Sequence, residues 1–297
     1  MASEEFQAFQ TAAAARPVPP PPASLDELRQ RIDGAMGGLP LADGTEAVLV
    51  DAGGVSAIEV RPVDLADDAP VLVYLHGGGF RIASALAYRA YGSHIAKRLG
   101  GRVLLVDYRL APEHPYPAAL DDTYTAFRWV IDTGTDPGRV AVAGDSAGGG
   151  LAASLALRTL PDGPTPAAVV CCSPWVDLTV TAGTYDTNAE SDKMFSRTSA
   201  DEASALYLGD HDRKDPLVSP VFGDWIGAPP LLIQVGSVET LLDDSKRLAE
   251  VATSAGVDVT LHTYDDMPHV WQMSYPAFPE AVEAVDEMVA FVQRATA

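Results

Sequence analysis

A serine sits between glycines where a predicted buried strand gives way to a helix. The motif Gly-Asp-Ser-Ala-Gly at 144–148 directly follows the apolar run 140–143 and precedes an alanine-rich stretch. Flanking glycines allow a turn too sharp for side chains, and such a turn lifts the hydroxyl of Ser146 to the helix N-terminus. A small-residue turn that merely packs a helix on a sheet is the alternative, but the strand, turn and helix context favours a nucleophilic serine.

A run of three glycines follows another predicted strand. Residues 76–80 read His-Gly-Gly-Gly-Phe after the apolar run 71–75. Acyl transfer needs backbone N–H donors aimed at an oxyanion, and glycine lets the main chain approach without a β-carbon. We expect the amides of Gly77, Gly78 and Ala147 to form this oxyanion hole. An ordinary turn or a phosphate loop is the alternative, although the sequence has neither GxGxxG nor GxxxxGK.

A serine nucleophile needs a base, and three histidines follow Ser146. His211 lies in a charged stretch, and His262 lies on a predicted strand, where a structural role is the ordinary explanation. His269 lies in the loop just beyond that strand, at the sheet edge from which an imidazole can reach the serine. We expect His269 to be the base, and His76 to brace the glycine run by a side-chain hydrogen bond.

The elements that carry these residues alternate between strand and helix. This order predicts an α/β fold with a mostly parallel, doubly wound sheet, because continuous apolar β-forming runs are typical of strands buried on both faces. A hairpin with strands 46–50 and 55–60 precedes them. The predicted buried strands are 71–75, 103–106, 140–143, 167–172, 231–235 and 257–261, and the predicted helices are 88–99, 120–132, 148–160 and 241–255.

Two segments interrupt the alternation. Residues 1–45 contain a proline-rich spacer and then a helix whose start is indicated by Ser24. Between about 177 and 228 no strand is predicted, and Ser199 indicates the start of a short helix by a capping box. We expect the N-terminal arm and this insertion to form a cap on the catalytic domain, residues 46–297.

Composition limits the partners. Forty-one acidic residues against twenty Lys and Arg give a net charge of −21, which repels nucleic acid and anionic membranes. No apolar run approaches the ~18 residues of a membrane-spanning helix, and the first residues lack the pattern of a secretory signal, so we expect a soluble cytoplasmic protein. Cys171 and Cys172 adjoin in an apolar run and are most simply core residues. A small-molecule substrate fits these limits, and a homodimer is left open.

The motifs resemble those of the bacterial hormone-sensitive-lipase family (family IV) of α/β-hydrolase esterases. His-Gly-Gly-Gly-Phe, the stretch 107–119 and Gly-Asp-Ser-Ala-Gly-Gly occur in the family's order, and the resemblance continues through 173–175 and 217–220 to the C-terminus. It implies an α/β-hydrolase fold with an eight-stranded sheet flanked by helices, a small helical cap, and hydrolysis of carboxylic esters without a metal or organic cofactor.

The resemblance also assigns the acid and the pocket. In this fold the acid lies between serine and histidine in the chain, and the family's pattern places Glu239 there, where aspartate is usual. Asp243 and Asp244 fall in the first turns of the next helix, where acids commonly just favour the helix dipole. Our candidate substrate-binding residues are Phe80 and Trp175, although a packed indole at the cap junction is the alternative for Trp175.

The sequence thus predicts a serine carboxylesterase. Ser146 attacks the ester carbonyl, His269 takes its proton, Glu239 orients the imidazole, and water then releases the acyl-enzyme. A small, charged cap favours short-chain esters. Lactones and amides are open as substrates of the same machinery. The alternative is a noncatalytic small-molecule-binding protein on the same fold, against which the presence of His269 argues.

Overall fold

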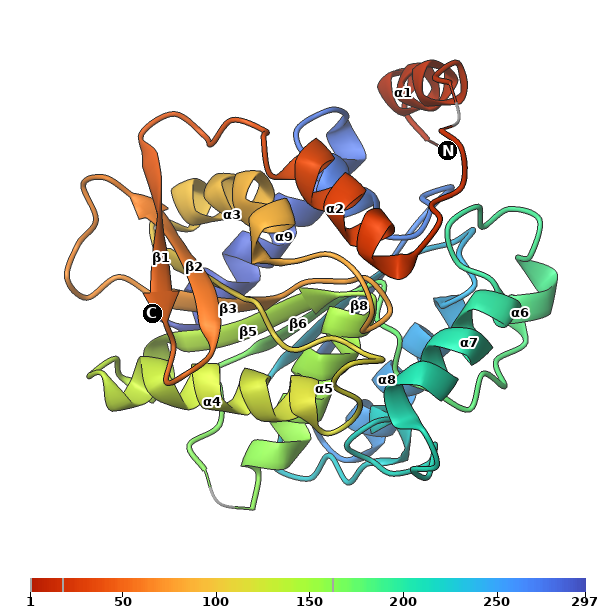
Figure 1. The fold of residues 1–297 in the computed structure, drawn as a ribbon. Helices are drawn as coiled ribbons and strands as arrows, with labels where there is room; N and C mark the ends of the chain where they lie inside the picture. The colour runs from red at the N-terminus through yellow and green to blue at the C-terminus, as the bar shows by residue number, and fades with distance from the viewer. Residues whose placement is uncertain (1, 18, 162) are drawn as a thin grey trace.

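A mixed sheet forms the centre of the molecule (Figure 1). The computed structural model describes residues 2–17, 19–161 and 163–297, so residues 1 and 18 of the predicted arm lie outside it. The strands are β1 (Thr45–Asp51), β2 (Ser56–Pro62), β3 (Val71–Leu75), β4 (Arg102–Val106), β5 (Val140–Asp145), β6 (Val169–Cys172), β7 (Leu231–Gly236) and β8 (Val259–Tyr264). They form one eight-stranded sheet in the order β1-β2-β4-β3-β5-β6-β7-β8. β2 is antiparallel to β1 and β4, and the other neighbours are parallel.

Helices cover both faces of the sheet. They are α1 (Glu4–Ala14), α2 (Leu25–Met36), α3 (Ala85–Leu99), α4 (Ala118–Asp132), α5 (Ala147–Thr159), α6 (Thr184–Thr187), α7 (Arg197–Leu208), α8 (Leu242–Ser254) and α9 (Pro279–Ala295). On one face Leu72 and Tyr74 of β3 pack with α3 and α9, and on the other Val73 and Leu75 pack with α4, α5 and α8. Successive side chains of β3 point to opposite faces of the sheet, and helices cover both faces. The strand is therefore buried at every position, which explains its continuous apolar sequence. No helix within the described ranges is long and apolar enough to cross a bilayer.

The predicted elements are found with small shifts at their ends. The hairpin turn is confirmed: Gly53 and Gly54 adopt φ angles of 76° and 96°, which glycine tolerates best. The start of α7 was placed wrongly at Ser199. The helix begins at Arg197, its N-cap is Ser196, and the two serine side chains cap each other's backbone amides. Helices α1 and α9 were not among the predicted elements.

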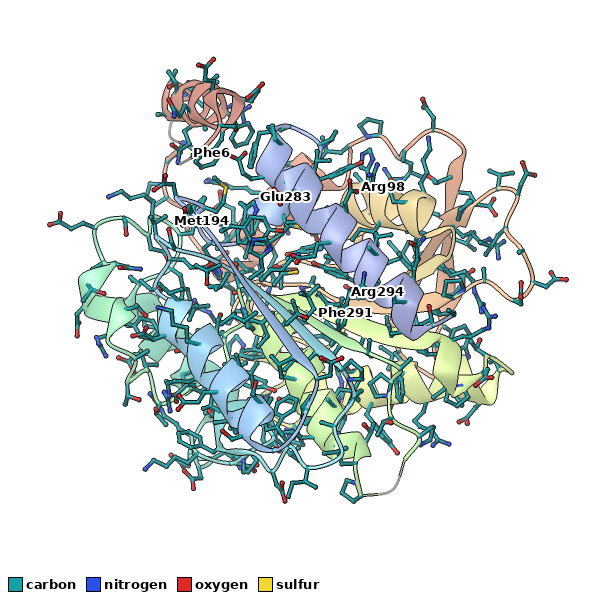
Figure 2. The ribbon with its side chains drawn as sticks, turned by 180° about the vertical axis from the view of Figure 1, so that it is seen from behind. Phe6, Arg98, Met194, Glu283, Phe291 and Arg294 are labelled. Atoms are coloured by element: carbon teal, nitrogen blue, oxygen red, sulfur yellow. The ribbon has the colours of Figure 1, made fainter. Side chains whose placement is uncertain are left out.

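Helix α1 of the N-terminal arm contacts the body of the molecule. Helix α1 lies against the beginning of α9, where the rings of Phe6 and Phe9 pack on Phe278 at centroid distances of 4.9 and 5.2 Å. Ser3 Oγ donates to Glu280 at 2.8 Å beside this aromatic contact. Figure 2 shows α9 crossing this face of the molecule, with Phe6 on α1 beyond one end of it.

Helix α2 is fastened by Arg29. Its Nε donates to the backbone oxygen of Arg81 at 2.8 Å, and its two terminal nitrogens bond the carboxylate of Glu113 at 2.9 and 2.8 Å. The hydrogen bond from Arg29 is the main reason why the pKa of Glu113 is lowered to about 2. Arg29 therefore ties the arm to the segment that follows the glycine run.

Candidate active site

Ser146 occupies a strained turn between β5 and α5. Its φ and ψ angles are 53° and −120°, an unusual conformation for a residue with a side chain. A β-carbon at Gly144 would overlap the carbonyl group of Gly148, and one at Gly148 would overlap the carbonyl of Leu75. The prediction that both flanking glycines are required is confirmed. The turn leaves Ser146 at the carboxyl edge of the sheet.

His269 joins the serine to a carboxylate. Its Nε2 lies 2.9 Å from Ser146 Oγ, and its Nδ1 lies 2.7 Å from Glu239 Oε2. Glu239 follows β7 and His269 follows β8, so neighbouring parallel strands deliver both side chains to the edge that holds Ser146. Because the carboxylate only accepts, Nδ1 carries the imidazole proton and Nε2 is free to accept the proton of the serine hydroxyl.

The second oxygen of Glu239 is also satisfied. Glu239 is fully buried, and its Oε1 accepts hydrogen bonds from Gly236 N at 2.6 Å and from Ser173 Oγ at 2.9 Å. Ser173 Oγ in turn accepts from Val270 N at 3.1 Å. Ser173 thus connects the acid to the residue beside His269. Sequence reasoning missed this role, and its only signal was the Ser-Pro-Trp stretch at 173–175.

Asp192 fastens the insertion to the same acid loop. Its Oδ2 accepts from the amide and hydroxyl of Thr240 at 2.8 and 3.0 Å, next to Glu239 in the chain. Its Oδ1 accepts from the amides of Met194 and Phe195 at 2.9 and 3.0 Å. No short motif marks Asp192 in the sequence, because its partner lies 48 residues away.

Buried carboxylates control the protonation of His269. Burial alone would lower its pKa, but the hydrogen bond and charge of Glu239, with smaller contributions from Asp192 and Asp145, outweigh burial and raise the pKa above the ordinary value. The side chain is only 5% exposed, so solvent screens these charges weakly. The arrangement favours an imidazolium, which forms when the serine gives up its proton.

The prediction for Gly77 is wrong. Its N–H already donates to Tyr88 Oη at 3.1 Å and to Asp145 Oδ1 at 3.2 Å, so this amide points at buried acceptors. A β-carbon at Gly77 would overlap the Asp145 carboxylate. Glycine is therefore required here to let Asp145 approach. Gly78 and Gly79, with φ angles of 121° and 60°, continue the run into the cavity.

Asp145 is the buried acceptor that holds the glycine run. It accepts from Tyr74 Oη at 3.0 Å and from Tyr88 Oη at 2.8 Å in addition to Gly77 N. Burial raises the pKa of Asp145 to about 6, although these hydrogen bonds partly oppose the shift. Its neighbours are therefore those that an ionised carboxylate requires. In the sequence Asp145 is one residue of the Gly-Asp-Ser-Ala-Gly motif, and nothing there indicated its contact with the glycine run.

A cavity of about 340 Å³ opens above Ser146 and His269. Its walls are mostly apolar and come from several elements, including Ile32 and Met36 of α2, Met194 and Phe195 of the insertion, Ile82 and Met273. Phe80 and Trp175 are 2% and 0% exposed and are not among the described residues that line it. Phe80 stacks on Tyr207 at 3.9 Å, and Trp175 packs against Phe195. Neither ring borders the cavity in this structure, and Trp175 follows the packed-indole alternative.

The two acids after Glu239 differ in role. Asp243 is partly exposed and accepts from Thr184 N at 3.2 Å. Asp244 is fully buried and accepts from the amides of Val176 and Asp177 at 3.3 and 3.1 Å. Burial, followed by the charge of Asp177, raises its pKa well above the usual range. Asp244 is therefore not a simple helix-dipole acid.

Three other histidines, His76, His211 and His262, make structural contacts. His76 Nδ1 lies 2.8 Å from the backbone oxygen of Gly77, which confirms its predicted contact with the glycine run. His211 Nε2 lies 2.7 Å from Asp215 Oδ2, and His262 Nδ1 lies 3.2 Å from the Glu287 carboxylate. None of these three contacts involves Ser146.

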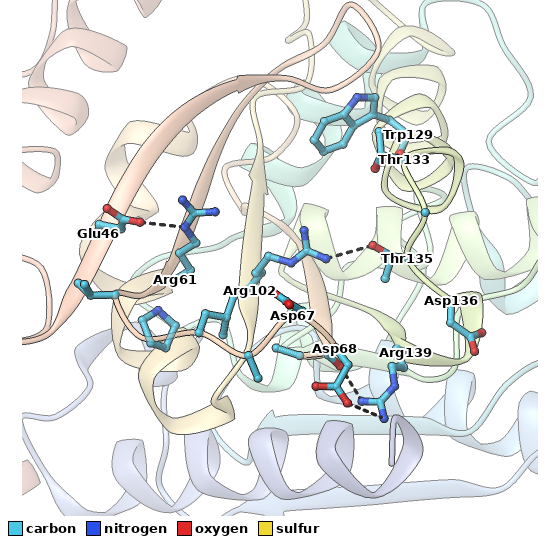
Figure 3. A pocket seen from close by; sticks show the side chains of 16 residues that line it. Glu46, Arg61, Asp67, Asp68, Arg102, Trp129, Thr133, Thr135, Asp136 and Arg139 are labelled. Carbon is cyan, nitrogen blue, oxygen red and sulfur yellow. Dashed lines mark hydrogen bonds and ion pairs between the residues drawn. The ribbon is translucent and has the colours of Figure 1, made fainter.

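A larger hollow of about 770 Å³ lies away from these residues, beside β1, β2 and the end of α4 (Figure 3). Its arginines are engaged: Arg61 Nε bonds Glu46 at 2.9 Å, and Arg102 bonds Thr135 at 3.0 Å. None of the described residues that line it is a serine, cysteine or histidine, so we place the chemistry in the smaller cavity. In the described part of the chain, no three His, Cys, Asp or Glu side chains are grouped to hold a metal ion.

Comparison with known proteins agrees with this geometry. Residues 72–273 match the family model described as alpha/beta hydrolase fold. An acetyl-hydrolase from Streptomyces hygroscopicus is 40% identical over 84% of this chain and 83% of its own length, and an esterase from Acinetobacter venetianus is 37% identical over 79% and 82%. A crystal structure of an esterase from the bacterial hormone-sensitive lipase (HSL) family superimposes with a TM-score of 0.91, at 41% identity and with both chains fully covered. The chain belongs to the bacterial hormone-sensitive-lipase family of α/β hydrolases. It is a carboxylic ester hydrolase.

Replacing Glu239 by glutamine should remove most of the turnover. In this variant the amide oxygen would take the position that accepts from Gly236 N. The amide NH2 would then face His269 Nδ1. The imidazole proton would then move to Nε2, and the base would be lost. We expect kcat to fall by roughly 10³ to 10⁴ with the melting temperature little changed.

Asp243→Asn is the matched control, because it neutralises an acid four residues away that does not contact His269. Its kcat should stay within about threefold of the parent, as is usual for partly exposed sites. If Glu239→Gln retains most of its activity and Asp243→Asn loses it, the carboxylate that orients His269 is Asp243 and not Glu239.

The acidic limb of the pH–rate profile should report His269. Activity requires the neutral imidazole, and its raised pKa places the limb above the pH expected for an ordinary histidine. Asp192→Asn removes one charge that raises this pKa, so the limb of kcat/KM should move to lower pH. Asp243→Asn should leave it in place. A shift to higher pH in Asp192→Asn would contradict this electrostatic account.

Proposed function

We propose that Ser146, His269 and Glu239 are the catalytic residues of this esterase. The serine oxygen attacks the ester carbonyl while its proton passes to His269 Nε2, and Glu239 holds the resulting imidazolium. The imidazolium then protonates the leaving alkoxide. Water, giving its proton to the same nitrogen, attacks the acyl-enzyme and releases the acid and the serine. The observation that carries this proposal is the pair of contacts of His269, at 2.9 and 2.7 Å.

We propose the amides of Gly78, Gly79 and Ala147 as the oxyanion donors. Gly78 and Gly79 border the cavity beside Ser146, and Ala147 begins α5, so its N–H is one of those left without a carbonyl partner at a helix start. Gly77 is not among the proposed donors, because its N–H already donates a hydrogen bond to Asp145. Such donors act best when they are fixed before the charge develops.

We propose that residues 1–45 and about 177–228 form a cap on a catalytic domain of residues 46–297. In support, Ile32 and Met36 from the arm and Met194 and Phe195 from the insertion border the same cavity as Ser146. A cavity of about 340 Å³ lies at the small end for ligand sites. We therefore propose short-chain esters, with small lactones as further substrates.

Hydrolysis is favoured over simple binding. A noncatalytic binding protein has no need of a base within hydrogen-bond distance of a serine in a strained turn, yet both features are present at Ser146. A cytoplasmic location remains an expectation from the sequence, and a homodimer remains open.

Chain-length preference tests the proposal. We expect kcat/KM for p-nitrophenyl acetate, butyrate and hexanoate to exceed that for the palmitate by about tenfold or more, because the longer chain exceeds the cavity. Ser146→Ala should lose nearly all of this activity, by a factor on the order of 10⁵ or more. Full activity in Ser146→Ala would refute the nucleophile, and equal turnover of palmitate would refute the account of the cap.

A further inference from the structure

Arg81 is a cation without a partner in the wall of the active-site cavity. It is the second residue after the glycine run and borders the same cavity as Ser146. Its Nε is shielded from solvent and makes no hydrogen bond, and no ion pair engages its guanidinium within the described residues. Buried polar atoms nearly always have partners, so an unsatisfied one at a binding cavity suggests a missing ligand.

The guanidinium lies against the glycine run. A β-carbon at Gly79 would be 3.8 Å from Arg81 Nε and 4.0 Å from Nη2. Burial lowers the pKa of Arg81, and the nearby charge of Glu202 on α7 partly opposes this, but Glu202 forms no ion pair with it. An arginine stays protonated under such conditions, so the cavity wall carries a full positive charge.

Other arginines of the same region are satisfied. Arg29 bonds the carboxylate of Glu113 and two backbone oxygens, and on the insertion Arg197 and Arg213 pair with acids at 2.9 and 3.0 Å. The chain has forty-one acids for twenty Lys and Arg, so carboxylates are plentiful. Among the described residues, Glu202 is near enough for its charge to act on Arg81, yet no carboxylate forms an ion pair with the guanidinium.

We propose that Arg81 binds an anionic group of the substrate, so that the preferred substrates are esters with a carboxylate or similar anion close to the ester bond. This inference rests on the proposed function, because it takes Ser146 as the nucleophile. Asp145 also borders the cavity, but its carboxylate accepts hydrogen bonds from Tyr74, Tyr88 and Gly77 N. The remaining walls are largely apolar, and a cation without a partner in such a pocket can fix the orientation of an anionic ligand. The guanidinium fork matches a carboxylate, which it binds through two parallel hydrogen bonds.

Two matched substrate pairs test the proposal. Mono-p-nitrophenyl glutarate and p-nitrophenyl valerate differ by a carboxylate on the acyl side. 4-Acetoxybenzoate and its methyl ester differ by one on the alcohol side. The quantity measured is the ratio of kcat/KM for the anionic ester to that for its neutral partner.

In Arg81→Met this ratio should fall roughly tenfold or more for at least one pair, as expected when a hydrogen-bonded charge loses its partner. Arg81→Lys keeps the charge and should lose less. The contact from Arg29 uses the backbone oxygen of Arg81, so neither variant removes it. Lys214→Gln removes an exposed positive charge from the insertion and should leave the ratio unchanged.

Three outcomes would overturn the inference. In the first, kcat/KM in Arg81→Met falls equally for the neutral and the anionic ester of both pairs, so that the ratio is unchanged. Arg81 would then support the oxyanion region and would not bind an anionic group of the substrate. An equal fall in Lys214→Gln would mean a long-range charge effect. If Arg81→Met does not fold, an unchanged ratio in a folded Arg81→Lys and in Arg81→Gln decides against it. Ser146-dependent hydrolysis of p-nitrophenyl valerate keeps the proposed function intact in each case, whereas its absence would refute that function instead.

Discussion

The close approach of backbone segments at the carboxyl edge of the sheet is the constraint on which the rest of the site depends. The turn at Ser146 fits against β3 only because Gly148 has no side chain, and Asp145 reaches the glycine run only because Gly77 has none. The bond from Gly77 N to Asp145 then fixes how the following residues face the cavity. Donors placed in this way need no rearrangement when negative charge develops on a substrate.

In the proposed mechanism His269 serves as base and then as acid, and the charges around it favour both steps. Glu239, Asp192 and Asp145 are all less than a tenth exposed, and their charges act on His269. Each carboxylate is held by several donors, which lowers the cost of burying it. Asp192 also links the insertion to the loop of Glu239 by hydrogen bonds. Arg81 is the only lysine or arginine among the described residues that line the cavity.

Local patterns in the sequence predicted much of this site. The alternation of strands and helices predicted that Ser146, Glu239 and His269 lie at the carboxyl edge of the sheet. Each of them follows a strand that its apolar run identifies in the sequence. Contacts between distant segments could not be predicted. The amide of Gly77 is taken by Asp145, 68 residues away, and Asp244 is buried by amides that no local pattern connects to it. The sequence also does not show which way an aromatic side chain points. Phe80 and Trp175 were therefore expected in the cavity, whereas the structure buries both rings beside it.

The structure of a phosphonate adduct of the enzyme tests the central claim most directly. The account predicts a covalent bond to Ser146 Oγ, with the phosphoryl oxygen within hydrogen-bond distance of the amides of Gly78, Gly79 and Ala147. The bond from Gly77 N to Asp145 should persist. An oxygen held by Gly77 N with Asp145 displaced, or an adduct on another residue, would contradict it.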